Sequence, residues 1–360
     1  MFSALSDLVP LYPLYALLFA DSGLTGGQIA SLFVLWSAAS LALEVPTGAL
    51  ADVVSRRALL FAGGLLHALG FGLWVFAPGY WIFALGFVLW AAGSALQSGT
   101  IEALVYDELA ALGAEGGYQR LSSAAYTSAI AGMIVATACA SPLFALGGYR
   151  AAGVASVLAA VAGGLVGLSF PRQPKVASAD GFGLRAWFGM LRAGWSEAVR
   201  VRRVRRLVLI AALLPGFGAM DEFFPLLAEH TGAATTVVPL LIVVIAAGQL
   251  AGGASAGWPL RGRTVGLATT VGALAIVAGA LSGSPWGVLL VAAGYGAWQH
   301  ATVVADARLQ AAVRGPARAT VTSVAGFGAE VASIALYVPW GLAVGPLGDG
   351  AAVAVTAAPL

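Results

Sequence analysis

The length of the uncharged segments constrains this chain more than any other feature. Residues 58–101 and 264–305 contain no Asp, Glu, Lys or Arg. Each segment is about twice the roughly 20 apolar residues that a helix needs to cross a membrane. Of the 360 residues, 60% are hydrophobic and 9% are charged, whereas a soluble domain carries about 25% charged residues. Because the segments also lack the alternation of membrane β-strands, we predict an all-α polytopic membrane protein.

Apolar segments that are long enough to span a membrane recur along the whole chain. We predict spans at residues 2–20, 28–50, 58–76, 80–103, 121–146, 151–170, 207–228, 234–256, 264–282, 286–307 and 318–344. Only 11 residues follow Asp349, which is about 16 Å of helix, so the last helix is predicted to be truncated. Cys139 lies inside an apolar segment, and we expect it to pack between helices as a small residue.

A hydrophilic segment divides the chain into two predicted helical bundles. Residues 1–170 contain six spans, residues 171–206 form a linker, and residues 207–360 contain five spans plus a short stub. Apolar residues at helical spacing and a cluster of arginines predict an amphipathic helix of the linker in the membrane interface. With a cytoplasmic N-terminus and linker, 17 of the 18 Lys and Arg lie on the cytoplasmic side, as the positive-inside rule requires. The basic cluster therefore marks topology, and no nucleic-acid partner is expected.

Each half of the chain contains four residues, spaced four apart, near the end of its second span. They are Glu44, Gly48, Asp52 and Arg56 in the first half and Gln249, Gly253, Gly257 and Arg261 in the second. Internal repeats in a membrane protein indicate two similar bundles with a site near the middle of the membrane.

The segment GALADVVSRR at residues 48–57 resembles the loop signature between the second and third spans of the major facilitator superfamily. The segments EVPTGALAD, SGTIEALVYDEL and DEFFPLLAEHTG are similar to bacterial members whose substrates are poorly assigned. The resemblance covers nearly the whole chain and implies two six-helix bundles with a pseudo-two-fold repeat. It also implies a monomeric carrier in the bacterial inner membrane, working by alternating access without a cofactor or metal. The second copy departs from the signature, because Gly257 replaces the aspartate.

The resemblance further implies a cytoplasmic gate. Its residues are Gly48, Asp52, Arg56, Arg57, Asp107 and Arg318. Asp52 would face the positive N-terminal end of the helix that starts near Arg318, and one of the two adjacent arginines would pair with Asp107 or Glu108. These contacts would stabilise an outward-facing state. The alternative is that these residues only fix topology and the turn.

Several acids lie within predicted spans, where carboxyl groups are costly and usually functional. They are Glu330, Asp221, Glu222 and Glu44. Because an apolar environment disfavours the charged form, such an acid can bind and release a proton near neutral pH. We therefore regard them as candidates for proton coupling, with the proton gradient as the energy source. A structural hydrogen bond to a neighbouring helix is the alternative for each.

The family architecture implies that the first, fourth, seventh and tenth spans line the substrate cavity. Candidate residues there are Tyr12, Tyr15, Trp90, Gln97, Phe223, Phe224, Trp298, Gln299 and His300. An aromatic, sparsely charged cavity suits a hydrophobic or weakly cationic small molecule. Packing is the alternative for each residue, and His67, on a span that the family places peripherally, is expected to be structural.

The predicted function is proton-coupled export of a small organic compound. Pro142, Gly147 and Gly148 lie near the end of the fifth span, at altered spacing from a Gly-Pro signature of superfamily antiporters. Proton-coupled uptake, or a carrier that has become a non-transporting receptor, are the alternatives. An enzyme is not expected, because the three histidines are scattered, no HExxH or Cys pair occurs, and we expect no serine elbow.

Overall fold

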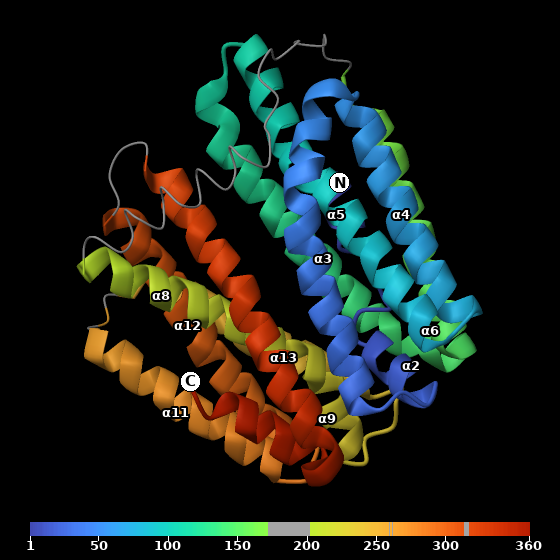
Figure 1. The fold of residues 1–360 in the computed structure, drawn as a ribbon, viewed down its shortest axis with the longest axis vertical. Helices are drawn as coiled ribbons and strands as arrows, with labels where there is room; N and C mark the ends of the chain where they lie inside the picture. The colour runs from blue at the N-terminus through green and yellow to red at the C-terminus, as the bar shows by residue number, and fades with distance from the viewer. Residues whose placement is uncertain (172–201, 259, 261, 313–316) are drawn as a thin grey trace. The chain divides into compact units, whose positions relative to one another are not determined.

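The computed structural model describes residues 1–171, 202–258, 260, 262–312 and 317–360. Every regular element in these residues is a helix (Figure 1), and nine continuous helical stretches of the described chain are long and apolar enough to cross a membrane. The predicted all-α polytopic class is therefore confirmed. The linker residues 172–201 lie outside the described residues, so the amphipathic helix stays a prediction.

The chain forms two compact units. Unit 1 comprises Met1–Ser22 and Leu35–Leu184, and unit 2 comprises Gly23–Val34 and Arg185–Leu360. The first part of the chain forms α1 (Phe2–Ser6), α2 (Tyr15–Asp21), α3 (Gly26–Val53), α4 (Arg56–Phe76), α5 (Tyr80–Ala111), η1 (Glu115–Gly117) and α6 (Tyr118–Leu168). The second part forms α8 (Arg202–Phe217), η2 (Gly218–Phe223), α9 (Phe224–His230), α10 (Val238–Ser255), α11 (Gly262–Leu281), α12 (Gly287–Ala312) and α13 (Ala317–Ala357).

The two parts repeat one order of elements. Each begins with an interrupted span and continues with three single helices. Each ends with two consecutive helices joined across a sharp kink, which together form α6 in the first part and α13 in the second. The kinks follow from glycines with positive φ, Gly148 at 60° in α6 and Gly348 at 78° in α13, a conformation that other residues rarely adopt. The residue after each of these glycines contacts the end of the first span: Tyr149 Oη donates to Asp21 Oδ2 over 2.6 Å, and Asp349 Oδ2 lies 3.7 Å from His230 Nδ1.

The interrupted first span corrects the prediction of one helix over residues 2–20. Helix α1 ends at Ser6 and α2 starts at Tyr15. Pro10 and Pro13 lack an N–H group and disfavour helical conformation in the preceding residue. The backbone between the two helices forms local hydrogen bonds. In addition, the Leu11 N–H donates to Ser156 Oγ over 3.0 Å.

The first span of unit 2 is interrupted as well, where we predicted one helix over 207–228. The α-helix ends at Phe217, a 3₁₀ segment follows, and α9 begins at Phe224. Pro215 lies just before this segment and Pro225 just after it. Both parts of the chain therefore open with a discontinuous helix, and the interruption contains one acid in the first part and two in the second.

Glycines allow close helix contacts within both units. The glycine pairs in contact are Gly63 with Gly93 and Gly70 with Gly86 in the α4–α5 hairpin, and Gly272 with Gly294 and Gly279 with Gly287 in the α11–α12 hairpin. In each hairpin the two pairs are seven residues apart, which is about two helical turns. Small residues that let backbones approach are the usual device for packing helices in lipid, and here the same device recurs in corresponding hairpins.

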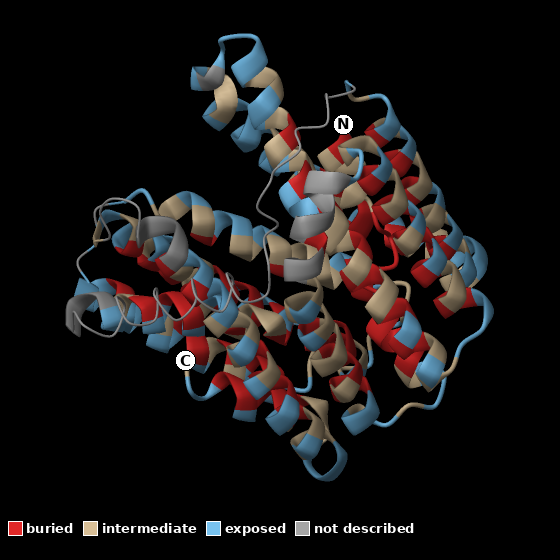
Figure 2. Ribbon diagram, turned by 45° about the horizontal axis from the view of Figure 1, so that its top comes forward, coloured by how far each residue is buried: buried red, intermediate tan, exposed pale blue. Residues whose placement is uncertain are grey.

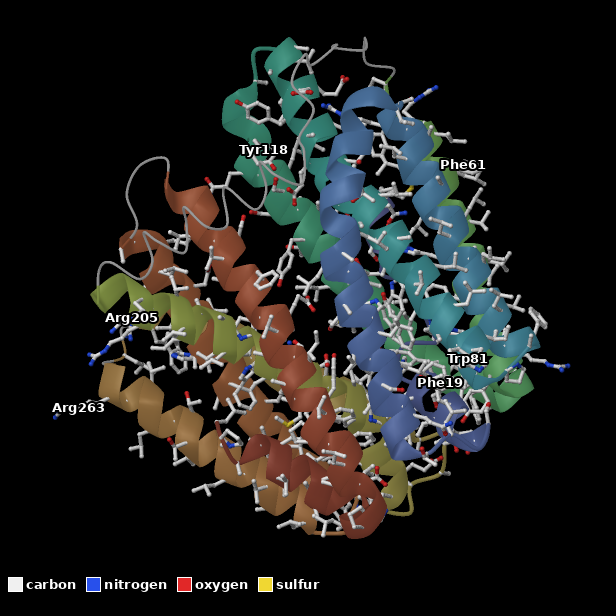
Figure 3. The ribbon with its side chains drawn as sticks, viewed as in Figure 1. Phe19, Phe61, Trp81, Tyr118, Arg205 and Arg263 are labelled. Atoms are coloured by element: carbon white, nitrogen blue, oxygen red, sulfur yellow. The ribbon has the colours of Figure 1, made fainter. Side chains whose placement is uncertain are left out.

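Large apolar side chains cover the outside of both units. Figure 2 shows the buried residues where helices meet within a unit and the exposed residues along the outer faces. Trp81 (Figure 3) and Trp286 are 79% and 78% exposed at corresponding positions, at the starts of α5 and α12. Tryptophans at such positions are typical of the membrane–water interface. Cys139 is also exposed, so the expectation that it packs between helices is wrong.

Candidate functional site

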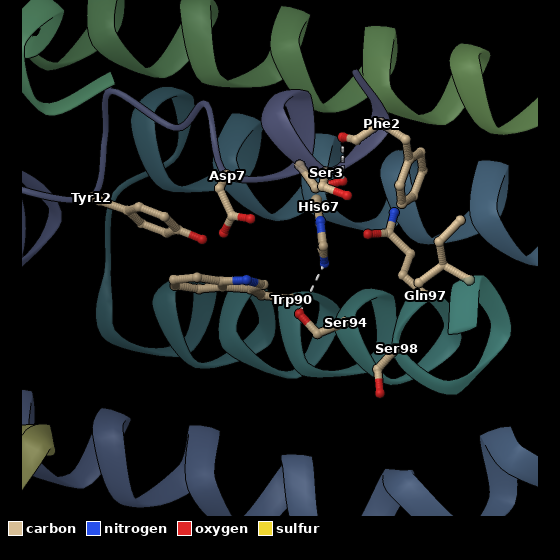
Figure 4. Close-up of a pocket in the computed structure, with 11 residues that line it drawn as sticks. Phe2, Ser3, Asp7, Tyr12, His67, Trp90, Ser94, Gln97 and Ser98 are labelled. Carbon is tan, nitrogen blue, oxygen red and sulfur yellow. Dashed lines mark hydrogen bonds between the residues drawn. The ribbon is translucent and has the colours of Figure 1, made fainter. Parts of the chain in front are cut away.

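A cavity of about 250 Å³ lies in unit 1, beside the interruption of the first span. It is lined by Phe2, Ser3, Ser6, Asp7, Tyr12, His67, Trp90, Ser94, Gln97, Ser98 and Ile101. Figure 4 shows Asp7 and Tyr12, from the segment between α1 and α2, facing Trp90 of α5. The first and fourth spans thus meet at this cavity, as the family architecture implies.

Aromatic rings form one side of the cavity. The Tyr12 and Trp90 rings are nearly parallel, with centroids 5.2 Å apart and planes at 22°. Tyr15 does not line the cavity, because it is 4% exposed and packs among Phe19, Trp74 and Trp90 in the core of unit 1. Of these three predicted cavity residues, Tyr12 and Trp90 line the cavity. Tyr15 instead packs against the Trp90 ring, with centroids 6.1 Å apart.

Neutral polar groups form the other side. Gln97 Nε2 donates to the Leu60 carbonyl oxygen over 3.3 Å, and His67 Nε2 lies 3.2 Å from Ser94 Oγ. His67 was expected to be peripheral and structural, but it lines the cavity. We did not select it from the sequence because it lies on the third span, which the family architecture does not place at the substrate cavity.

Asp7 is the cavity residue that we did not select from the sequence. Its side chain is half-buried, and no hydrogen bond or ion pair joins its carboxylate to another described residue. The available signal was an acid followed by two prolines inside an apolar span. That combination indicates a broken helix with a polar group at the break.

The second candidate site is the interrupted first span of unit 2. Side chains from α12 and α13 bind the carbonyl oxygens around the interruption. Tyr295 Oη donates to Gly218 O over 2.9 Å, Trp298 Nε1 donates to Leu214 O over 2.6 Å, and Ser333 Oγ lies 3.4 Å from Gly216 O. Tyr295 and Trp298 also stack on one another, with centroids 4.4 Å apart. These contacts tie the 3₁₀ segment and the helix end before it to α12 and α13.

Asp221 and Glu222 lie in the 3₁₀ segment itself. Asp221 is exposed and Glu222 is half-buried, and the Tyr295 side chain lies beside Asp221. Irregular backbone with a carboxyl group is tolerated at membrane depth only where it lines a polar cavity or is enclosed in protein. Glu330 is half-buried on α13, and the side chain of Glu44 lies outside those that the structure describes.

The other cavity candidates of unit 2 have packing or structural roles. Phe223 stacks on Trp340 with centroids 3.9 Å apart, and Phe224 meets Tyr295 edge-on at 5.2 Å. Both phenylalanines are fully buried. The prediction that they line a cavity is not supported by this placement, because their rings fill the core of unit 2.

Two adjacent polar residues of α12 pair with α10. Gln299 Oε1 accepts a hydrogen bond from Gln249 Nε2 over 3.3 Å, and His300 Nδ1 lies 2.8 Å from Ser255 Oγ. Residues 253–257 do have the G-x-S-x-G spacing that we did not expect. However, Ser255 ends a helix instead of lying on a strand-to-helix turn, so the structural context of a serine nucleophile is missing. Within the described part of the chain, no cluster of three His, Cys, Asp or Glu could hold a metal ion.

The gate residues are described in part. Arg56 Nη1 lies 2.6 Å from Asp107 Oδ2 and links the start of α4 to the end of α5. Arg57 Nη1 instead donates to Leu168 O over 3.1 Å, where a cation favours the negative C-terminal end of a helix. The side chains of Asp52 and Arg318, and the surroundings of Gly48, lie outside what the structure describes.

The sequence model of the Major Facilitator Superfamily matches residues 1–337. The chain belongs to the Major Facilitator Superfamily. The resemblance seen in the GALADVVSRR segment is therefore confirmed over most of the chain.

Solved structures of other Major Facilitator Superfamily proteins share the fold. A mutant of the nucleoside transporter NupG has a TM-score of 0.76 at 15% identity, covering 99% of this chain and 94% of that one. A bacterial homolog of the human lysosomal transporter Spinster has a TM-score of 0.68 at 15% identity, covering 99% and 89%. A D-xylose–proton symporter has a TM-score of 0.68 at 15% identity, covering 99% and 94%. A search of curated proteins found no match.

Reversing the charge of Arg56 is expected to slow transport without unfolding this superfamily member. The pair with Asp107 is partly exposed, with side chains 22% and 50% accessible, and an exposed ion pair contributes about 0.2–1 kcal/mol. We therefore expect Arg56→Glu to shift Tm by only a few degrees and to lower the initial transport rate several-fold if the pair supports the gate. The double variant with Asp107→Arg should recover part of the rate.

The matched control is Arg263→Glu. Arg263 is exposed near the start of α11, the helix that corresponds to α4, and its side chain points away from the unit (Figure 3). Wild-type transport in Arg56→Glu, or equal losses in the two single variants, would contradict a gate role for the Arg56–Asp107 pair.

Proposed function

We propose that the protein is a secondary active transporter that moves a small organic compound by alternating access and exports it in exchange for protons. The observation that carries this proposal is the interrupted first span in each unit, with Asp7 at one interruption and Asp221 and Glu222 at the other. Interrupted helices at corresponding positions of two repeats are the strongest structural pointer to a binding site in a transporter.

Acids at the interruptions support proton coupling. A carboxyl group in a weakly polar environment exchanges protons near neutral pH more readily than a fully solvated one. In unit 2 the acids lie on a short 3₁₀ segment between two α-helices, and such mid-helix 3₁₀ segments often mark a functional hinge. The proton gradient is the proposed energy source, and no cofactor is required.

The proposed setting is the inner membrane of a bacterium, with the protein working as a monomer. The distribution of Lys and Arg supports a cytoplasmic N-terminus and linker. The cavity of about 250 Å³ in unit 1 supports a small substrate, because cavities for drug-sized ligands have about 300–1,000 Å³.

Proton-coupled uptake is the second candidate. The similarity in fold to a D-xylose–proton symporter favours it, whereas export is favoured by Pro142 and the Gly147–Gly148 kink near the end of the fifth span.

The sign of the pH gradient separates these two functions. The purified protein is reconstituted in liposomes and tested with a panel of radiolabelled nucleosides, sugars and small organic amines. An exchanger accumulates a compound when the lumen is acidic, because protons leave as the compound enters. A symporter accumulates it when the outside is acidic. Both results are independent of the orientation of the protein, since carriers are reversible. Movement of no compound under either gradient would overturn transport and favour a non-transporting receptor.

A further inference from the structure

We propose that the cavity of unit 1 recognises an organic cation and that the Asp7 carboxylate is its charge partner. This inference deepens the proposed function, because the cation would be the transported compound. It rests on three features of the cavity, which are its charge, its aromatic wall and its size.

The charge of the cavity comes from one side chain. Among the eleven lining residues, Asp7 is the only acid and there is no Lys or Arg. No described residue forms an ion pair or hydrogen bond with its carboxylate. A half-buried carboxylate without a partner is costly, and a bound cation removes much of that cost. The other titratable groups in the wall are His67 and the Tyr12 phenol, and His67 Nε2 is engaged with Ser94 Oγ at 3.2 Å.

The aromatic wall is suited to the apolar part of such a ligand. Figure 4 shows the Asp7 carboxylate on the same side of the Trp90 ring as Tyr12. A cation held by Asp7 would therefore lie over an aromatic face. A cation within about 6 Å of a tryptophan or tyrosine ring gains roughly 0.5–2 kcal/mol, the larger value when it is desolvated. A carboxylate and an aromatic face acting together select an alkylated or aryl ammonium group over a neutral molecule of the same shape.

The remaining lining groups disfavour an anion, which would meet Asp7 without any fixed cation in the wall to compensate. Two of the neutral polar groups are already engaged, because Gln97 Nε2 is bonded to the Leu60 carbonyl and Ser94 to His67. A cavity of about 250 Å³ fits a ligand with one ring and one ammonium group.

Two probes of equal shape test the proposal. Phenyltrimethylammonium and tert-butylbenzene differ only in a positively charged nitrogen in place of carbon. Their binding to the full-length protein in nanodiscs is measured by calorimetry, with empty nanodiscs as the blank for partition into lipid. We expect the cation to bind at least tenfold more tightly than its neutral isostere. Asp7→Asn should remove that preference, and Tyr12→Leu should weaken cation binding several-fold.

The control carboxylate is Asp21, at the other end of the same interrupted span, where it accepts a hydrogen bond from Tyr149. Asp21→Asn should keep the preference for the cation. If Asp7→Asn does not fold, Asp7→Glu keeps the charge and should keep the preference. Equal binding of the two probes to the wild type, or an unchanged preference in Asp7→Asn, overturns the inference. Proton-driven transport of a neutral compound alongside either result would leave the proposed function standing, so the two can fail separately.

Discussion

Replacing Asp221 with asparagine is expected to abolish the ability of a pH gradient to drive accumulation of the transported compound. One pH unit corresponds to 1.36 kcal/mol, so a gradient of two units can support about 100-fold accumulation when one proton is exchanged. Asparagine has nearly the same shape as aspartate but does not bind and release a proton. We therefore expect the accumulation ratio of Asp221→Asn to fall to about one.

The structure gives the reason for choosing Asp221 among the candidate acids. It lies on the 3₁₀ segment of the interrupted span, it is exposed, and the Tyr295 side chain lies beside it. Tyr295 also bonds the backbone of that segment at Gly218. A change in the protonation of Asp221 can therefore alter how the interruption is held against α12.

Exchange measurements separate lost coupling from lost folding. Asp221→Asn should still exchange labelled for unlabelled compound without a gradient, because exchange needs the substrate site but no net proton movement. Glu222→Gln and Glu330→Gln, tested in parallel, show which acid is required. Asp349→Asn, at the Gly348 kink of α13 beside His230, is the control acid. Gradient-driven accumulation that survives in Asp221→Asn and is lost in Glu330→Gln would move the coupling role to Glu330.

Replacing Gly252 with alanine is expected to destabilise unit 2 severely. A β-carbon at Gly252 would overlap the carbonyl oxygen of Gly296 on α12, and Gly248, one turn earlier, faces Ala292 in the same way. The clash is with backbone, so α10 and α12 must move apart. Overpacking of this kind costs about 1–3 kcal/mol and occasionally more. We expect a fall in Tm of several degrees and, for the larger Gly252→Leu, loss of the monodisperse peak in size-exclusion chromatography.

The neighbouring residue provides a matched control. A β-carbon at Gly253 would meet only the Gln299 side chain, at 3.7 Å, which is ordinary contact. Gly253→Ala therefore adds helix propensity of about 1 kcal/mol without a clash, and its Tm should stay equal or rise. If the two alanine variants have the same Tm, the close approach of α10 and α12 is not as the structure describes it.

Sequence alone determined the class of the protein and the positions of its membrane segments. Uncharged runs such as 58–101 are long because lipid offers no partner for charged groups, and this effect is a sum over single residues. The family could also be recognised from the sequence, because the GALADVVSRR signature is one short contiguous segment. Neither inference depends on which residues face each other.

The tertiary structure decided which residues form the candidate sites. Lipid is as apolar as the protein interior, so hydropathy does not mark the face of a helix that packs against its neighbours. For that reason Phe223 and Phe224 looked like cavity residues although they fill the core, and His67 looked peripheral although it lines the cavity. Asp7 gained its significance only when the interruption before Tyr15 brought it opposite Trp90. Whether a polar side chain in a span is a ligand or a packing residue depends on what the neighbouring helix presents to it, and that information is absent from the order of residues along one helix.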